Sequence, residues 1–342
     1  MTYKFRLPAE WEPQDAVLLS WPHAQTDWAP ILNEVEECYM RIARAIAADE
    51  PLIVVTPQPE HVRELLTDIP QEKLLLVKTM TNDTWIRDYG PITLVAQDGD
   101  STHLDFTFNG WGMKFAANYD NQVCRALAAQ GLLDGRVVNM QDMVLEGGSI
   151  ESDGNGTIMT TRSCLLSPNR NDFMSPDEIE EALKEKLQIK KVLWVSEGYV
   201  PGDDTDGHID TLARFAPDNV ILHATARPED SHFESLESMR AQLAEMTDAQ
   251  GKQFRLMPLP APEPIFDEDG TLLPATYANF LVTNQSVLVP TYNQEGNDKK
   301  ALAVLEQSFE GRKIVGIDCT ALIKQHGSLH CATMQIPKGS IK

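Results

Sequence analysis

The sequence lacks several features that would assign it to a common class of protein. It contains no run of about 18 apolar residues, and its first residues, MTYKFRLPAEWEP, hold no apolar core of a secretion signal. We therefore expect a cytoplasmic protein. Neither G-x-G-x-x-G nor G-x-x-x-x-G-K-[ST] occurs, so a nucleotide-binding fold would lack its phosphate loop.

Cysteine is scarce and its spacing is uninformative about disulfides. The five cysteines are odd in number, lie far apart and form no C-x-x-C pair: Cys38, Cys124, Cys164, Cys319 and Cys331. This excludes a disulfide framework and a thiolate zinc site. Each cysteine is then either a small core residue or a reactive thiol.

Basic residues are few: 29 Lys and Arg oppose 51 Asp and Glu, for a net charge of −22. Such a charge repels phosphate backbones and anionic lipids, so we expect neither nucleic-acid nor membrane binding. It favours a small cationic ligand, although solubility alone also accounts for it. The content of 42% hydrophobic and 23% charged residues is typical of soluble globular proteins. No Pro- or Gly-rich linker divides the 342 residues, so we expect a single domain, 1–342.

Short β-rich apolar runs alternate with helical patterns along the whole chain, which predicts an α/β fold. Ser175-Pro176-Asp177-Glu178 is a particularly clear helix start, with an N-cap serine, proline at N1 and glutamate at N3. We expect helices at 30–48, 61–66, 119–130, 175–187, 231–247 and 298–309, and strands at 15–20, 52–56, 103–108, 144–150, 157–161, 191–195, 209–215, 219–223, 279–283, 286–290, 313–317 and 331–336.

Six segments whose residue pattern differs from that of an ordinary hydrophobic core recur at intervals of 52 to 71 residues. Their markers are Trp21, Asp88, Glu146, His208, Asn279 and Cys331. Similar αβ modules arranged in a ring, each sending one loop to the centre, would produce this spacing. The alternation of strands and helices alone would equally allow a doubly wound sheet.

Five residues in these segments could carry chemistry. His208 and Asp210 stand at the expected start of a strand, where residues i and i+2 share one face. Cys331 would need a histidine from a distant segment to act as a nucleophile, and His208 is the best placed. His330 is a poor base for this thiol, because consecutive strand residues point to opposite faces.

The carboxylates Asp88 and Glu146 complete the set, Glu146 lying at the end of an apolar run before Gly147 and Gly148. Three hard carboxylates with one soft thiolate suit no common metal ion, so we expect no metal. A planar guanidinium fits them, since its donors pair bidentately with carboxylates.

Five ordered motifs make the sequence resemble the agmatine deiminase and Porphyromonas-type peptidylarginine deiminase family over residues 8–337. The motifs are NDTWIRDYGP (82–91), FNGWG (108–112), LEGGS (145–149), DTDGHID (204–210) and GSLHC (327–331). The resemblance implies a five-bladed pseudo-symmetric α/β propeller, the pentein fold, and hydrolysis of a guanidinium group to a ureido group and ammonia without a cofactor.

The resemblance also implies residue roles. Cys331 attacks the guanidinium carbon, and His208 protonates the departing ammonia and then activates water. Asp88 and Asp210 grip the guanidinium nitrogens, and Glu146 holds the guanidinium and assists His208. The carboxylates should raise the pKa of His208.

The chain departs from the pattern of typical agmatine deiminases near the distal end of the substrate. Asp204 replaces a glutamate, and Met113 follows Trp111-Gly112 where Trp-Gly-Gly is usual. Agmatine, giving N-carbamoylputrescine, is the expected substrate, with peptidylarginine or free arginine as the alternative. Trp85 and Trp111 are expected to stack on the cation or to belong to the core. An amidinotransferase, a non-catalytic binding protein and a homo-oligomer all stay open.

Overall fold

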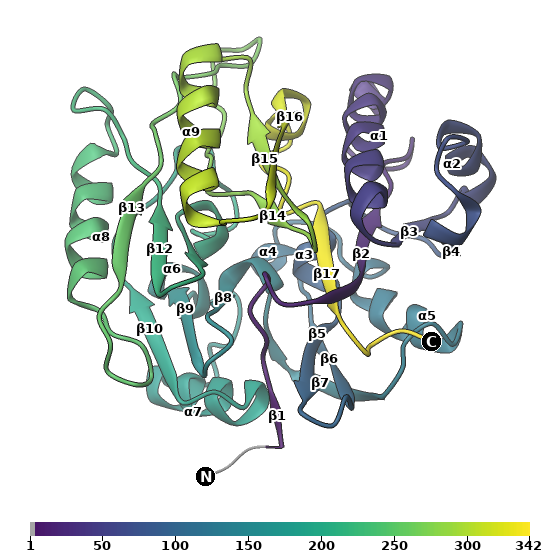
Figure 1. Ribbon diagram of the computed structural model, residues 1–342, viewed down its shortest axis with the longest axis horizontal. Coiled ribbons are helices and arrows are strands. Elements are labelled where there is room, and N and C mark those ends of the chain that lie inside the picture. The colour runs from purple at the N-terminus through teal and green to yellow at the C-terminus, as the bar shows by residue number, and fades with distance from the viewer. Residues whose placement is uncertain (1–3) are drawn as a thin grey trace.

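The computed structural model describes residues 4–342, which form five small mixed sheets (Figure 1). Each sheet contains the same unit of three strands. The first and second strands are antiparallel, and the third is parallel to the second. Parallel neighbours require a crossover connection, and in every unit a helix supplies it.

The five units and their crossover helices follow one another along the chain. They are β5 (Ile92–Ala96), β6 (Ser101–Thr107) and β7 (Arg136–Val144) with α5 (Val123–Ala129); β8 (Ile150–Ser152), β9 (Thr157–Thr161) and β10 (Lys191–Val195) with α7 (Pro176–Leu187); β11 (Ala213–Ala216), β12 (Val220–His223) and β13 (Arg255–Pro258) with α8 (Phe233–Glu245); β14 (Leu281–Val282), β15 (Ser286–Thr291) and β16 (Lys313–Asp318) with α9 (Glu295–Ser308); and β17 (Thr333–Pro337), β2 (Gln14–Ser20) and β3 (Leu52–Thr56) with α1 (Leu32–Asp49).

Two edge strands and several short helices complete the fold. β1 (Phe5–Arg6) pairs with β5, and β4 (Leu74–Lys78) follows α2 (Pro59–Leu65) and pairs with β3. The short helices are α3 (Ile86–Tyr89), α4 (Gly110–Met113), α6 (Arg162–Leu165) and α10 (Thr320–Ile323). None of the helices within residues 4–342 combines the length and hydropathy needed to cross a bilayer.

The fifth unit joins the two ends of the chain. β17 pairs with β2, and Met334 lies opposite Leu18 (yellow beside purple in Figure 1). The crossover helices lie at the periphery of the view, whereas α3 and α4 lie near its centre. Strands such as β3 and β9 are buried along their whole length, as expected for strands covered on both faces. The expected ring of five αβ units is therefore confirmed.

Most expected elements are present within a few residues, including α7 with both hydrogen bonds of the Ser175–Glu178 capping box. Three expected strands are wrong where they reach the centre of the ring. β7 ends at Val144 and β8 begins only at Ile150, with a 3₁₀ turn at Gly147–Ser149 between them. Another 3₁₀ turn, Ile209–Thr211, replaces the first half of the strand expected at 209–215.

The third correction concerns the C-terminal strand, which begins at Thr333 and so excludes both His330 and Cys331. All three segments are apolar because they are buried at the centre of the ring rather than because they join a sheet. Burial imposes the same apolar composition on a central turn as on a strand. The alternation argument for His208 with Asp210, and for His330 with Cys331, therefore does not apply.

Candidate functional site

Each of the five units directs the segment before its first strand to the centre of the ring. α3 precedes β5, the turn after β7 precedes β8, the Ile209–Thr211 turn precedes β11, and irregular segments precede β14 and β17. These five segments carry, in order, Asp88, Glu146, His208 with Asp210, Asn279, and Cys331. All six side chains are buried. The repeated topology thus brings together residues that lie far apart in the sequence.

Gly148 marks the point where three of these side chains meet. A β-carbon built on Gly148 would lie 2.6 Å from His208 Nδ1, 2.8 Å from Asp88 Oδ1 and 3.2 Å from Asp210 Oδ2. The Gly148 N–H donates a hydrogen bond of 2.9 Å to Asp88 Oδ1. Glycine is required here because any side chain would displace the imidazole or a carboxylate.

Cys331 lies beside this group. Its Sγ is 3.7 Å from Asp210 Oδ2, and Asn279 Nδ2 donates to it at 3.2 Å. The Asn279 Oδ1 accepts from the backbone N–H groups of His330 and Cys331. Burial, together with the negative charges of Asp210 and Asp88, raises the pKa of the Cys331 thiol well above its usual range. The thiol is therefore neutral at pH 7 until a cation arrives.

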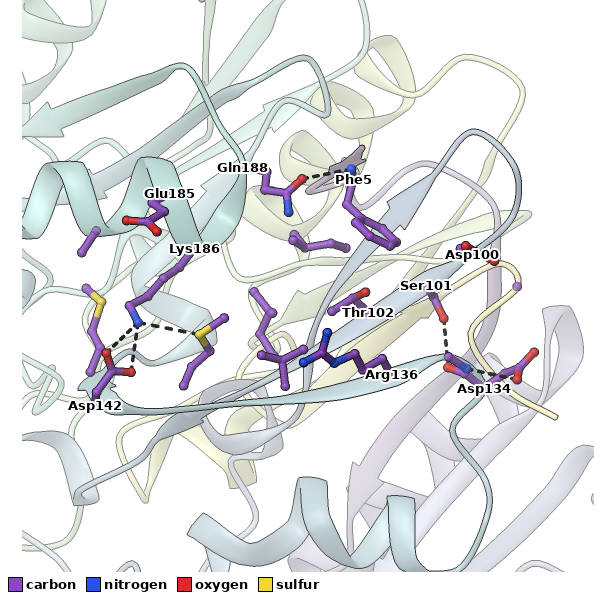
Figure 2. Close-up of a pocket in the computed structure, with 18 of the residues that line it drawn as sticks. Phe5, Asp100, Ser101, Thr102, Asp134, Arg136, Asp142, Glu185, Lys186 and Gln188 are labelled. Carbon is purple, nitrogen blue, oxygen red and sulfur yellow. Dashed lines mark hydrogen bonds and ion pairs between the residues drawn. The ribbon is translucent and has the colours of Figure 1, made fainter. Parts of the chain in front are cut away.

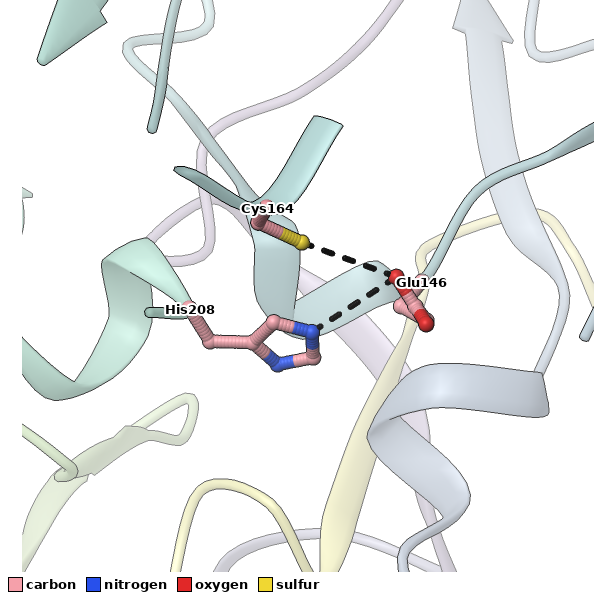
Figure 3. A group of neighbouring side chains, drawn as sticks. All are labelled: Glu146, Cys164 and His208. Carbon is pink, nitrogen blue, oxygen red and sulfur yellow. Dashed lines mark hydrogen bonds and ion pairs between the residues drawn. The ribbon is translucent and has the colours of Figure 1, made fainter. Parts of the chain in front are cut away.

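Glu146 is held by an arginine and contacts a second thiol. Arg170 Nε lies 3.1 and 2.8 Å from its two carboxylate oxygens. Figure 3 shows His208 Nε2 and Cys164 Sγ pointing to the same carboxylate, each 3.7 Å from Oε2. Burial opposes ionisation of Glu146, but His208 and Arg170 together lower its pKa.

A carboxylate, a thiol and an imidazole within 4.8 Å are a combination that can bind a transition metal. Here Arg170 already binds both oxygens of Glu146, so its positive charge occupies the place of a cation. Burial raises the pKa of the Cys164 thiol, which keeps this residue protonated and a poor ligand. The geometry suits a charged support that stabilises protonated His208 better than a metal centre.

His208 and Asp210 both keep unused hydrogen-bonding capacity. Among the described residues, none offers a hydrogen-bond partner to either ring nitrogen of His208 or to Asp210 Oδ1, although all three atoms are buried. Burial alone would lower the pKa of His208, but the negative charge of Asp88 and contacts with Cys164 and Glu146 raise it well above its usual range. Buried polar atoms without partners indicate a site that awaits a polar ligand.

A cavity of about 110 Å³ leads from Cys331 to the surface. Asp88, Trp85 and Trp111 line it next to the thiol, and Trp111 Nε1 donates to Asp88 Oδ2 at 2.9 Å. Trp111 has a left-handed backbone (φ 54°), an unusual conformation for a tryptophan that the side chain of Asn109 stabilises by binding the Gly112 N–H. Five of the expected site residues line the cavity, namely Trp85, Asp88, Trp111, Asp204 and Cys331, whereas His208, Asp210 and Glu146 do not.

The outer part of the cavity is acidic. Asp27, Asp83 and Asp204 line it together with His326, and among its described lining residues there is no lysine or arginine. Burial raises the pKa of Asp83 to about 7 and that of Asp88 to about 6. No positive charge lowers the pKa of Asp83, whereas His208, whose Nδ1 lies 3.6 Å from Asp88 Oδ1, partly offsets the effect of burial on Asp88.

A larger cavity, of about 1040 Å³, lies between the β5–β6–β7 sheet and α7. Figure 2 shows the Lys186 ammonium bound to Asp142 and the Ser101 hydroxyl bound to Asp134, whereas Arg136 and Glu185 form no hydrogen bond or ion pair with the other residues drawn. None of the residues expected to act in catalysis lines it. The smaller cavity at Cys331 is therefore the candidate active site.

Sequence reasoning did not identify several residues of this site: Asp27, Asp83, Cys164, Arg170 and the supporting role of Asn279. Asn279 was marked by its spacing alone, and its position before β14 matches that of the other site residues before their own strands. Arg170 lies in a loop after α6, where nothing in the residue pattern distinguishes it from a surface arginine. Its buried side chain is visible only in the structure.

Comparisons with known proteins agree with the fold. Residues 6–337 match the family of Porphyromonas-type peptidyl-arginine deiminases. A crystal structure from Porphyromonas gingivalis, described as a "putative arginine deiminase", is 48% identical and superimposes with a TM-score of 0.92, covering 99% of both chains.

Agmatine deiminases are similar along the whole length as well. The agmatine deiminase of C. jejuni, solved as a cysteine-to-serine variant with substrate bound, is 36% identical, with a TM-score of 0.90 and 99% coverage of both chains. The agmatine deiminase of Medicago truncatula is 33% identical over 97% of this chain and 96% of its own. The chain therefore belongs to the Porphyromonas-type peptidyl-arginine deiminase family.

Proposed function

We propose that the protein hydrolyses agmatine to N-carbamoylputrescine and ammonia. The observation that carries this proposal is the group of buried, unpartnered polar atoms on His208 and Asp210 next to the Cys331 thiol, at the inner end of an acidic cavity. A guanidinium supplies a donor for Asp210 Oδ1 and a positive charge that offsets the carboxylates Asp88 and Asp210. The family membership of the chain supports the same reaction.

The first half of the reaction forms a covalent intermediate. Asp88 and Asp210 bind the guanidinium nitrogens, and the substrate cation offsets the negative charges that raise the pKa of Cys331. The Cys331 thiol then loses its proton to solvent, and the thiolate attacks the guanidinium carbon. As the C–S bond forms, one C–N bond breaks, and the leaving nitrogen takes a proton from His208 and departs as ammonia.

The second half hydrolyses the thiouronium adduct. His208, now neutral, accepts a proton from water as the hydroxide attacks the same carbon. The C–S bond breaks, the ureido product leaves and the Cys331 thiol is restored. Glu146, anchored by Arg170, lies 3.7 Å from His208 Nε2 and stabilises the imidazolium that is present before the first half and forms again in the second half.

The acidic outer cavity supports agmatine over free arginine. The distal ammonium of agmatine would lie among Asp27, Asp83 and Asp204. Free arginine carries a carboxylate at that end, and the described lining residues include no lysine or arginine to pair with it. A peptidylarginine has neither group, and the 42% identity to a crystal structure described as a "putative peptidyl-arginine deiminase" keeps it as the second candidate.

The test measures ammonia and ureido product from agmatine, free arginine and a short arginyl peptide at equal concentrations. We expect turnover of agmatine and at least about tenfold lower kcat/KM for the other two, because each loses an ion pair at the outer cavity. Cys331→Ser serves as the inactive control. Turnover of none of the three compounds would refute the proposal, and preference for the peptide would transfer it to the second candidate.

A further inference from the structure

His330, next to Cys331 in the sequence, is hydrogen-bonded to two buried carboxylates. Its Nδ1 lies 2.7 Å from Asp210 Oδ2, and its Nε2 lies 2.7 Å from Glu10 Oε2. All three side chains are at most 6% exposed. The proposed reaction uses Asp210 but assigns nothing to His330 or Glu10.

The two contacts determine the protonation of the ring. A neutral imidazole has one N–H, so one of its nitrogens would face a carboxylate oxygen with no proton between them. Burial opposes ionisation of both acids, yet the contact with His330 lowers the pKa of Asp210, and Arg214 with His330 lowers that of Glu10. Two carboxylates therefore face the two nitrogens of one ring, a geometry in which an imidazolium would donate one N–H to each.

Glu10 forms the fixed end of this arrangement. Its Oε2 also accepts a hydrogen bond of 2.9 Å from Arg214 Nη2, and Arg214 Nε is bound to Glu151 at 2.8 Å. The Asp210 carboxylate is the other end. Its Oδ2 is occupied by His330, which leaves Oδ1 as the oxygen without a partner among the described residues. His330 thus determines which oxygen of Asp210 is presented to a ligand.

We propose that His330 is a positioning residue that, as an imidazolium anchored on Glu10, holds the Asp210 carboxylate with Oδ1 directed at the substrate guanidinium. The inference rests on the proposed function, since it assigns Asp210 to guanidinium binding. The same segment carries the nucleophile, and Asn279 Oδ1 accepts from the N–H groups of both His330 and Cys331. Asn279 therefore supports both His330, which holds Asp210, and the nucleophile Cys331.

Two amide substitutions separate the two contacts of His330. The amide nitrogen of asparagine lies where histidine has Nδ1, so His330→Asn retains a donor to Asp210 and loses the contact with Glu10. The amide nitrogen of glutamine lies where histidine has Nε2, so His330→Gln retains the contact with Glu10 and leaves Asp210 Oδ2 without a donor. Both variants remove the positive charge, and neither adds volume to the site.

The experiment measures agmatine dissociation constants by calorimetry in a Cys331→Ala background, where no turnover occurs, and kcat and KM in the parent background. We expect His330→Gln to weaken binding about tenfold to 100-fold and His330→Asn by less than about fivefold, because only the former loses the charge-assisted bond to Asp210. His223→Gln is the matched control, since His223 is also buried and has one backbone contact in β12, away from the site.

The inference would be overturned if the two His330 variants bound agmatine equally, or if both bound it as tightly as the protein with His330. In either case, turnover by the wild-type protein would still support the proposed function. Absence of wild-type turnover would instead refute the proposed function. Should His330→Gln fail to fold, ¹⁵N spectra of selectively labelled wild-type protein at pH 7.5 provide a second measurement. Protons on both ring nitrogens of His330 would support the inference, and a single proton would overturn it.

Discussion

The contacts around Gly148 lead to a prediction whose size follows from three distances. In Gly148→Ala the new methyl group would lie 2.6 Å from His208 Nδ1, 2.8 Å from Asp88 Oδ1 and 3.2 Å from Asp210 Oδ2. Nonbonded heavy atoms normally stay about 3.5 Å apart, so the imidazole and the nearer carboxylate must each retreat by roughly 0.7–0.9 Å. The Gly148 backbone is not left-handed, so the substitution adds no backbone strain.

This displacement should affect catalysis far more than stability. A shift of about 1 Å in a catalytic group costs on the order of 100-fold in rate, whereas overpacking one methyl group costs about 1–3 kcal/mol of the free energy of unfolding. We therefore expect kcat for agmatine to fall about 100-fold or more in a protein that still folds. Steady-state kinetics and denaturant unfolding measure the two quantities on the same preparation.

Gly296→Ala is the matched control. Gly296 lies in the first turn of α9, and no atom lies within 4 Å of a β-carbon built on it. Alanine should leave kcat unchanged and stabilise the fold by about 0.4–1 kcal/mol, because it reduces the freedom of the unfolded chain. A Gly148→Ala protein with kcat within threefold of wild type would refute the tight grouping of the imidazole and the two acids.

Three further predictions concern thiols and carboxyl groups. Cys331→Ser should lower kcat by about 10⁴-fold or more, whereas Cys164→Ser should retain activity within about tenfold, because Cys331 lines the cavity and Cys164 does not. Mass spectrometry of quenched reactions should find the adduct on Cys331 alone. The pKa values of Asp83 (about 7) and Asp88 (about 6) should fall when a cation binds, so agmatine affinity should rise between pH 5 and pH 8. Binding near pH 6.5 should release protons, which calorimetry in two buffers of different ionisation enthalpy detects. An affinity that does not depend on pH would contradict this prediction. Burial raises the pKa of Glu50 from 4.5 to about 7, so the folded state binds its proton more tightly than the unfolded state and stability should decrease as pH rises through this interval. Asp83 and Asp88 contribute to the same decrease, so Glu50→Gln should reduce it rather than abolish it. Denaturant unfolding at pH 5 and pH 8 should find the variant stabilised at pH 8 by at most about 3 kcal/mol.

The ring of αβ units was predictable because its signals are local or periodic. The local signals are the apolar runs and the Ser175–Glu178 capping box, each of which lies within one unit. The periodic signal is the regular spacing of the segments that reach the centre. The errors lie where segments enter the centre of the ring. At 144–150 and 209–215, burial produces an apolar sequence, while 3₁₀ turns at Gly147–Ser149 and Ile209–Thr211 take the place of strand.

The supporting contacts of the site could not be predicted, since they join residues with no fixed relation in sequence. Arg170 binds Glu146 from a loop 24 residues later, and His330 bridges Asp210 and Glu10 across 120 and 320 residues. A buried arginine and an exposed one have the same letter in the sequence. Only the packing around Arg170 shows that its charge is committed to Glu146.

By itself, the sequence determined the types of chemistry available: a set of acids, an imidazole and a thiol in four separate motifs, in a chain with a large negative charge. The tertiary structure decided which atoms of these groups remain free. The pairing of β17 with β2 joins the ends of the chain and brings Cys331 to Asp210. His330 binds Asp210 Oδ2, Arg170 binds Glu146 Oε2 and Trp111 binds Asp88 Oδ2. A hydrogen bond depends on distances of tenths of an ångström, which the long-range packing of all five units establishes and no local pattern encodes.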